Sequence, residues 1–180
     1  QNDLALSAKI VSRAGSERII RAAFEFARDH KRRKVTVIHK ANVVRATEGM
    51  FLEIARQVHK DFPEIQMDDA NVDAICMWLM KNPMNYDVLV ATNMFGDIVS
   101  DLAAQMVGGL GYGCSGNIGT RLAVFEPSHG SAPKYAGQYK VNPIATILSV
   151  RMMLDWLGEA AKAEAVERAV AAVISEGKVR

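Results

Sequence analysis

The chain has 180 residues, a formal net charge of +2 at pH 7, and 49% apolar, 23% charged and 7% aromatic residues. This size suits one domain or two small ones and excludes a large multidomain machine. Near-neutral charge disfavours nucleic-acid binding, since the only dense basic cluster, residues 31–34, is typical of a solvated turn.

The cysteines predict a reducing compartment. Cys76 and Cys114 are the only two, and neither belongs to a CxxC pair or lies near a histidine at metal-binding spacing. The longest apolar stretches fall far short of the roughly 20 residues that a membrane span needs. No targeting segment is visible at Gln1, so we expect a cytoplasmic protein without a membrane partner.

The first half of the chain alternates helical and extended patterns. Ser16 is a candidate N-cap for a helix that reaches about His30. The β-branched run Lys34 to His39 predicts a strand, and the near-continuous apolar run from Tyr86 to Thr92 predicts a strand buried on both faces. Between them we expect a helix from Glu48, a short strand at 64–67 and a helix at 69–81.

The second half begins with a helix from Asn93 to about Val107. The glycine-dense stretch 108–119 follows and is the best candidate for a domain boundary. A short strand at 121–125 and a long loop at 126–141 lead to Asn142-Pro143, an N-cap with proline at the first helical position. Helices are expected at 143–157 and 159–175. The alternation predicts an α/β protein.

One glycine pattern does not predict a dinucleotide site. Gly111, Gly113 and Gly116 satisfy G-x-G-x-x-G. That motif binds pyrophosphate when a strand precedes it and a helix follows, whereas here a helix precedes it and a strand follows.

Two aspartates form a candidate metal site. Asp97 and Asp101 are four residues apart near the start of a predicted helix, so both carboxylates lie on one helical face. Close carboxylates repel each other unless a cation is near, and Mg²⁺ or Mn²⁺ binds such oxygens. Spacing alone leaves the alternative that acids near a helix start complement its dipole, which accounts for Asp97 better than for Asp101 one turn later.

Two further segments carry polar side chains suited to chemistry. Lys40 and Asn42 follow the strand that ends at His39, at the carboxyl edge of the predicted sheet, although lysines at strand ends are commonly solvated. The loop 126–137 is long enough to be functional, and His129, Lys134 and Tyr135 in it suit a nucleotide.

These residues resemble the metal-dependent β-decarboxylating dehydrogenases, which comprise isocitrate, 3-isopropylmalate, homoisocitrate and tartrate dehydrogenases. The resemblance covers essentially the whole chain. It is carried by HKANVVRATEGMF (residues 39–51), NMFGDIVSDLAAQMVGGLG (residues 93–111) and EPSHGSAPKYAGQYKVNP (residues 126–143). Because the motifs occur in the family's order and spacing, they favour the metal interpretation of Asp97 and Asp101.

The resemblance implies a role for each matching residue. Asp97 and Asp101 match metal ligands, and Asp73 matches a third. The resemblance implies that Asp73 and Lys40 are both catalytic and that the other subunit of a homodimer supplies them. Asn42 matches a substrate-binding residue. The implied cofactor site comprises His129, Gly130, Ser131, Ala132, Lys134, Tyr135 and Asn142.

The resemblance also bears on cofactor and substrate. Family members that use NAD tend to have an acidic and an aliphatic residue where this chain has Lys134 and Tyr135, so we expect NADP. The KYAG pattern looks most like isocitrate dehydrogenases. The reaction implied is oxidative decarboxylation of isocitrate to 2-oxoglutarate with Mg²⁺ or Mn²⁺. Another family substrate with NAD, or a non-catalytic nucleotide-binding subunit, remains an alternative.

The resemblance implies an incomplete isocitrate/isopropylmalate dehydrogenase-like fold. Residues 1–110 match the small dimer-interface domain, and residues 111–180 match part of the large cofactor-binding domain. The family's N-terminal segment, which carries the residues that distinguish substrates, has no counterpart in this sequence.

Overall fold

The computed structural model describes residues 3–177 and divides into two compact units, one extending through Ser100 and one beginning at Asp101. The division falls within helix α4 (Asn93–Met106). The predicted functional domains 1–110 and 111–180 remain a proposal. No helix in the described part of the chain is long and apolar enough to cross a membrane.

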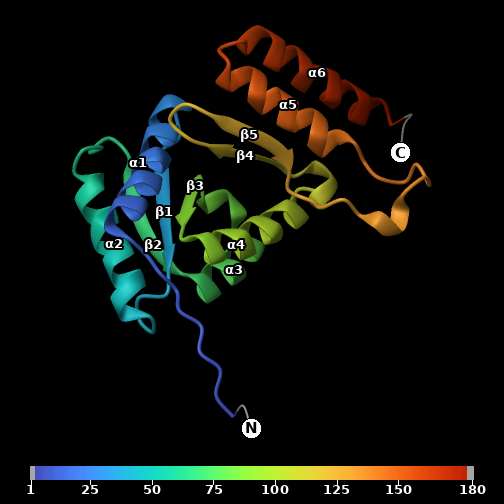
Figure 1. Cartoon of the computed structure of the whole chain (residues 1–180). Coiled ribbons are helices and arrows are strands. Elements are labelled where there is room, and N and C mark those ends of the chain that lie inside the picture. The colour runs from blue at the N-terminus through green and yellow to red at the C-terminus, as the bar shows by residue number, and fades with distance from the viewer. Residues whose placement is uncertain (1–2, 178–180) are drawn as a thin grey trace. The chain divides into compact units, whose positions relative to one another are not determined.

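The first unit is built on a three-stranded parallel sheet in the order β2-β1-β3. Its strands are β1 (Lys34–His39), β2 (Gln66–Asn71) and β3 (Val88–Ala91). Helices α1 (Arg13–Asp29) and α2 (Arg45–His59) cover one face, and α3 (Val72–Lys81) covers the other (Figure 1). A short 3₁₀ turn, η1 (Pro83–Asn85), precedes β3. This arrangement confirms the predicted α/β class.

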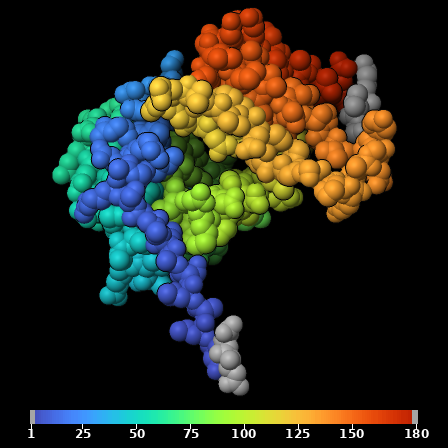
Figure 2. Space-filling model, viewed as in Figure 1, coloured from blue at the N-terminus to red at the C-terminus, as the bar shows by residue number. Residues whose placement is uncertain are grey.

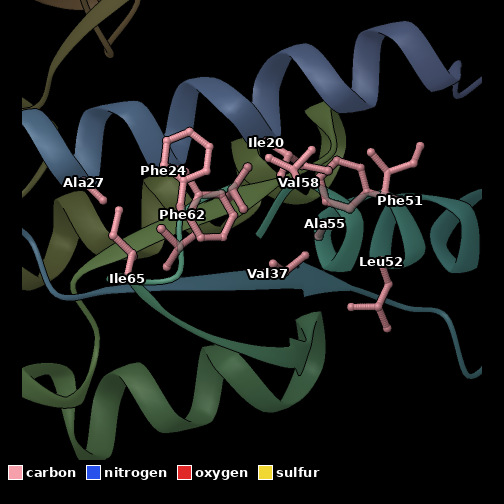
Figure 3. Packing of buried hydrophobic residues seen from close by; sticks show 13 residues of the cluster. Ile20, Phe24, Ala27, Val37, Phe51, Leu52, Ala55, Val58, Phe62 and Ile65 are labelled. Atoms are coloured by element: carbon pink, nitrogen blue, oxygen red, sulfur yellow. The ribbon is translucent and has the colours of Figure 1, made fainter. Parts of the chain in front are cut away.

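The core lies between the sheet and the α1/α2 layer. Phe24 of α1 is fully buried, and its ring stacks on Phe62 with centroids 5.3 Å apart (Figure 3). Phe51 and Ala55 of α2 pack into the same cluster, whose apolar side chains recur at helical spacing. β1 is buried along nearly its whole length because it is the central strand.

The structure corrects the predicted start of α1. Ser12, not Ser16, is the N-cap, and its hydroxyl accepts a hydrogen bond from the Gly15 amide at 3.2 Å. Ser16 is buried within the helix, and its hydroxyl donates to the Ser12 carbonyl at 2.8 Å. Both serines precede apolar positions at helical spacing, so the pattern alone did not determine which serine is the N-cap.

The boundary between β2 and α3 is also corrected. The expected strand at 64–67 instead spans Gln66–Asn71, and α3 starts at Val72 rather than at Asp69. The polar sequence QMDDAN has no strand-like alternation, but each of its residues pairs with β1. Pairing with a buried neighbour therefore overrides local propensity here.

Strand β3 is less buried than the sequence predicted. It was expected to be covered on both faces, but it is a half-buried strand at the edge of the sheet opposite β2.

The second unit contains the end of α4, an antiparallel hairpin and two further helices. Strands β4 (Cys114–Ile118) and β5 (Ala123–Pro127) pair, and α5 (Ile144–Trp156) packs against both strands and against α6 (Ala160–Glu176). The 3₁₀ turns η2 (Leu110–Tyr112) and η3 (Pro133–Tyr135) lie in the connecting segments. The prediction placed the second strand at 121–125 and missed β4.

The glycine-rich segment has a structural explanation. A Cβ at Gly111 would lie 3.0 Å from the Asn142 side chain, and one at Gly116 would lie 3.1 Å from the Phe125 ring. The missing side chains thus allow close approach of neighbouring chain segments. A 3₁₀ turn precedes Gly113 and a strand follows it, which agrees with the rejection of a dinucleotide motif.

Candidate functional site

The carboxyl edge of the parallel sheet gathers polar side chains of the first unit. His39 of β1 is opposite Asn71 of β2, and Ile38 is opposite Ala91 of β3, so the three strands end side by side. Lys40 follows β1 directly, Asp73 lies in the first turn of α3, and α4 starts just after β3. In open parallel sheets, ligands bind beyond this edge.

Lys40 and Asp73, both predicted as catalytic, are in direct contact. The Lys40 ammonium donates a hydrogen bond to Asp73 Oδ1 at 2.5 Å. This hydrogen bond lowers the pKa of the Asp73 carboxyl, and the amides of Asp73 and Ala74 contribute to the same shift. The Asp73 side chain is 67% exposed, whereas that of Lys40 is 22% exposed. The carboxylate therefore remains ionised and accessible to a cation or a partner molecule.

A buried histidine, which sequence reasoning missed, shapes the turn that carries Lys40. The amide of Ala41 donates to His39 Nδ1 at 3.0 Å, so Nδ1 carries no proton. Nε2 therefore carries the proton and donates to Asp69 Oδ2 at 2.9 Å. His39 is held from both sides, and this restricts the backbone on either side of Lys40. No sequence signal connects His39 to Asp69, because they meet only through β1–β2 pairing.

Asn42 lies in the turn between β1 and α2. The Lys40 carbonyl accepts hydrogen bonds from the amides of Val43 at 3.0 Å and Val44 at 2.8 Å, which closes the turn around Asn42. The Asn42 side chain is exposed, two residues from Lys40. It is therefore available to a ligand at the same strand end.

Asp97 and Asp101 have the chemistry of a metal site. Both are exposed on α4, one helical turn apart. Within residues 3–177, neither carboxylate makes a hydrogen bond or an ion pair, so both keep their oxygens available. Such a pair fits Mg²⁺ or Mn²⁺, which bind one or two carboxylates and complete their shell with substrate oxygens and water.

A full ligand set is not assembled in the described part of one chain. No group of three or more His, Cys, Asp or Glu side chains positioned for a metal occurs among residues 3–177. The predicted third ligand, Asp73, instead contacts Lys40. The sharing of Asp73 and Asp97 between two subunits stays a prediction.

The predicted cofactor residues lie in the second unit. Ala132 has φ of 44°, a left-handed conformation that turns the loop into η3. Lys134 and Tyr135 are exposed there, and the ammonium lies 4.8 Å from the centroid of the tyrosine ring. His129 is half-buried: Nδ1 lies 2.8 Å from the Gly130 carbonyl, and Nε2 has no hydrogen-bond partner among the described residues. Exposed Gly130 and Ser131 complete the loop.

The structure corrects the predicted start of the helix after this loop. Helix α5 begins at Ile144, so Pro143 rather than Asn142 is its N-cap. Asn142 lies one residue earlier, where its Oδ1 accepts a hydrogen bond from the Ile144 amide at 2.9 Å. The side chain also packs against Gly111. Asn142 is thus held on both sides.

A family model described as "Isocitrate/isopropylmalate dehydrogenase" matches residues 1–180. The chain is 51% identical to a 3-isopropylmalate dehydrogenase of Archaeoglobus fulgidus over 98% of its own length and 54% of that relative. It is 49% identical to a homoisocitrate dehydrogenase of Methanocaldococcus jannaschii, covering 99% of this chain and 51% of that protein.

Solved structures agree with these relatives. The crystal structure of isocitrate dehydrogenase from Methylococcus capsulatus superposes with a TM-score of 0.96 at 50% identity, covering 98% of this chain and 52% of that one. The chain therefore spans about half the length of the relatives it matches. With its motifs, sheet topology and these matches in agreement, the chain belongs to the isocitrate/isopropylmalate dehydrogenase family.

Proposed function

We propose that this chain is part of an NADP-dependent isocitrate dehydrogenase that requires Mg²⁺ or Mn²⁺. The reaction transfers a hydride from C2 of isocitrate to NADP, and loss of CO₂ gives 2-oxoglutarate. The observation that carries the proposal is the contact of Lys40 with Asp73 at the carboxyl edge of the sheet. This contact brings a proposed proton-transfer group, the Lys40 side chain, next to a proposed metal ligand, the Asp73 carboxylate. Metal-dependent oxidation of a hydroxyl group needs both kinds of group.

The proposed site residues divide between proton transfer, substrate binding and metal binding. Lys40 moves the proton of the substrate hydroxyl, and Asn42 orients the substrate from the same turn. Asp97, Asp101 and Asp73 would hold the divalent ion through their carboxylates. When bound, that ion supplies Lewis acidity at the substrate oxygens. The restricted turn after His39 supports the placement of Lys40, because it limits the positions that the ammonium can reach.

We place the site between the subunits of a homodimer. Exposed apolar side chains on two helices support this placement. Met77 and Met80 of α3 are 57% and 65% exposed, and Met94 and Ile98 of α4 are 54% and 52% exposed. Exposed apolar side chains on neighbouring turns are typical of subunit interfaces. In such a dimer, Lys40 and Asp73 of one subunit would complete the site that contains Asp97 and Asp101 of the other.

The choice of NADP rests on the charge of the second unit's loop. Lys134 is an exposed cation beside the exposed Tyr135 ring. An ammonium attracts the 2′-phosphate of NADP, and an aromatic face can stack on adenine. The unpaired Cys76 and Cys114 support a reducing location, for which we propose the cytoplasm.

A second candidate function is oxidation of 3-isopropylmalate, homoisocitrate or tartrate with NAD. Its support is the 51% identity to a protein named 3-isopropylmalate dehydrogenase, which is as high as the 50% identity to the solved isocitrate dehydrogenase to within one percentage point. The metal and base residues would keep the same roles, because the family members differ in the group attached to the substrate rather than in the reacting carbons.

The deciding experiment is reduced-nicotinamide absorbance with the complete gene product and Mn²⁺. Isocitrate and 3-isopropylmalate are each paired with NADP and with NAD. We expect strong absorbance only with isocitrate and NADP. Activity with 3-isopropylmalate would keep the metal site and overturn the substrate. Inactivity in every pairing would contradict isocitrate and 3-isopropylmalate as substrates, and it would favour either another 2-hydroxy acid of the family or a non-catalytic nucleotide-binding subunit.

A further inference from the structure

A partly buried polar cluster in the first unit lies outside the residues assigned so far. The Lys9 ammonium donates to Glu48 Oε1 at 2.5 Å and to Thr92 Oγ1 at 3.1 Å. The Thr92 hydroxyl in turn donates to Glu48 Oε1 at 3.3 Å. Lys9 also lies 4.2 Å above the centroid of the Phe95 ring. The cluster therefore joins the segment before α1, helix α2 and the connection from β3 to α4.

Burial of the Glu48 carboxylate gives this cluster a desolvation cost. The glutamate is 0% exposed, and its Oε2 accepts no hydrogen bond from any described residue. An ionised carboxylate in such surroundings needs a close cation, because desolvation is otherwise uncompensated. Lys9 supplies that cation from a segment without regular secondary structure that lies on the surface of the first unit (Figure 2).

The cluster contacts both turns that carry the proposed site. Glu48 lies in the first turn of α2, where its amide donates to the Val44 carbonyl at 3.1 Å, and the Val44 amide donates to Lys40. On the other side, the Thr92 carbonyl accepts the Gly96 amide at 2.8 Å, a hydrogen bond at the start of α4. Asp97 is the next residue after Gly96.

We propose that Lys9 is a positioning residue for the metal site. By holding Thr92 and Phe95 against Glu48, it fixes the direction in which α4 leaves β3, and with it the position of Asp97. The inference deepens the proposed function and rests on it. Lys9 itself binds neither metal nor substrate, and it acts only through the first turn of α4.

The test is Mn²⁺ binding to the complete protein, followed by the electron paramagnetic resonance signal of free Mn²⁺. Lys9→Met keeps the length of the side chain and removes its charge. We expect it to weaken Mn²⁺ binding by about tenfold, the lower end of the effect of residues that orient metal ligands. Hydrogen exchange of the Gly96 amide should become faster in the same variant.

The control separates positioning from general loss of stability. Phe24→Leu changes the core beneath α1, away from α4, and should lower the melting temperature without changing Mn²⁺ affinity. The inference would be overturned if Lys9→Met bound Mn²⁺ as tightly as the wild type. It would also be overturned if Phe24→Leu lost as much Mn²⁺ affinity as Lys9→Met. Should Lys9→Met fail to fold, Thr92→Val removes one hydroxyl with little change of shape. We expect several-fold weaker Mn²⁺ binding from it, and unchanged affinity would overturn the inference.

The wild-type protein distinguishes failure of this inference from failure of the proposed function. Absence of Mn²⁺ binding by the wild type would contradict the proposed metal site itself. Mn²⁺ binding by the wild type, with no response to Lys9→Met or Thr92→Val, would contradict only the role of Lys9.

Discussion

The ammonium of Lys40 and the carboxylate of Asp73 meet at 2.5 Å across the ends of two adjacent parallel strands. The two residues are distant in sequence, and the contact depends on β1 and β2 ending at the same edge of the sheet. A second lysine–aspartate pair joins the same strands near their other end, where Lys34 lies 2.9 Å from Asp68. The protein thus contains its own control for the first pair.

Removing the charge of Lys40 should raise the pKa of Asp73. The folded-state pKa of Asp73 is lowered, chiefly by the hydrogen bond from Lys40. The contribution of the pair to stability is therefore complete above the unfolded value of about 3.9 and is lost as the pH falls through the folded value. Carboxyl ¹³C NMR titration of Lys40→Met should show the pKa of Asp73 moving up toward its ordinary value.

Lys34→Met should leave the pKa of Asp73 unchanged, because it removes only the partner of Asp68. An unaltered titration of Asp73 in Lys40→Met would mean that the amides of Asp73 and Ala74, rather than Lys40, cause the shift.

Two inactive variants should complement each other in a mixed dimer. Asp97→Asn removes the charge of a proposed metal ligand and Lys40→Met removes the proposed base, so each homodimer should lose activity. A heterodimer has two sites. One site combines the intact Asp97 of one subunit with the intact Lys40 of the other, and the second site contains both substitutions. Random reassembly should therefore restore about a quarter of wild-type activity, since half the dimers are mixed and half their sites are intact.

This experiment is read by the rate of NADP reduction after denaturation and refolding of the mixed variants. Each variant refolded alone is the control for reassembly. A mixture as inactive as its components would place Lys40 and Asp97 in one subunit's site and refute the shared arrangement.

Reversing the charge of Lys134 should reduce the preference for NADP over NAD. In Lys134→Asp, a carboxylate would repel the 2′-phosphate and suit a free ribose hydroxyl, so the ratio of kcat/KM values for NADP and NAD should fall by tenfold or more. Lys162→Asp makes the same charge change in the first turn of α6, outside the predicted cofactor loop, where it breaks an exposed ion pair of Lys162 with Glu159 at 3.0 Å. Only Lys134→Asp should change the ratio, and an unchanged ratio would contradict the NADP assignment.

Two phenylalanines of α1 should differ sharply in their contribution to stability. Phe24 is fully buried, and its ring stacks on Phe62, so Phe24→Ala should lower the free energy of unfolding by about 3–5 kcal/mol. Phe26 is 50% exposed and stacks on the exposed His30 ring, so Phe26→Ala should cost about 1 kcal/mol or less. Urea denaturation compares them, and equal midpoints would contradict the described core.

Local patterns determined the α/β class and most elements of this chain. The strand Lys34–His39 was predicted with its observed bounds, because a β-branched run between polar segments has one consistent interpretation. The four-residue spacing of Asp97 and Asp101 was sufficient to place both on one helical face, since helix geometry is local. The motifs carried the family resemblance for the same reason: each is contiguous in sequence.

Tertiary structure decided the features that depend on pairing between distant segments. β2 is a strand because QMDDAN aligns beside β1, although its composition favours a loop. The contacts of His39 with Asp69 and of Lys9 with Glu48 join residues whose sequences give no sign of each other. Charge and hydrogen bonding act over a few ångströms of space, so only the folded chain determines which of its polar side chains become partners.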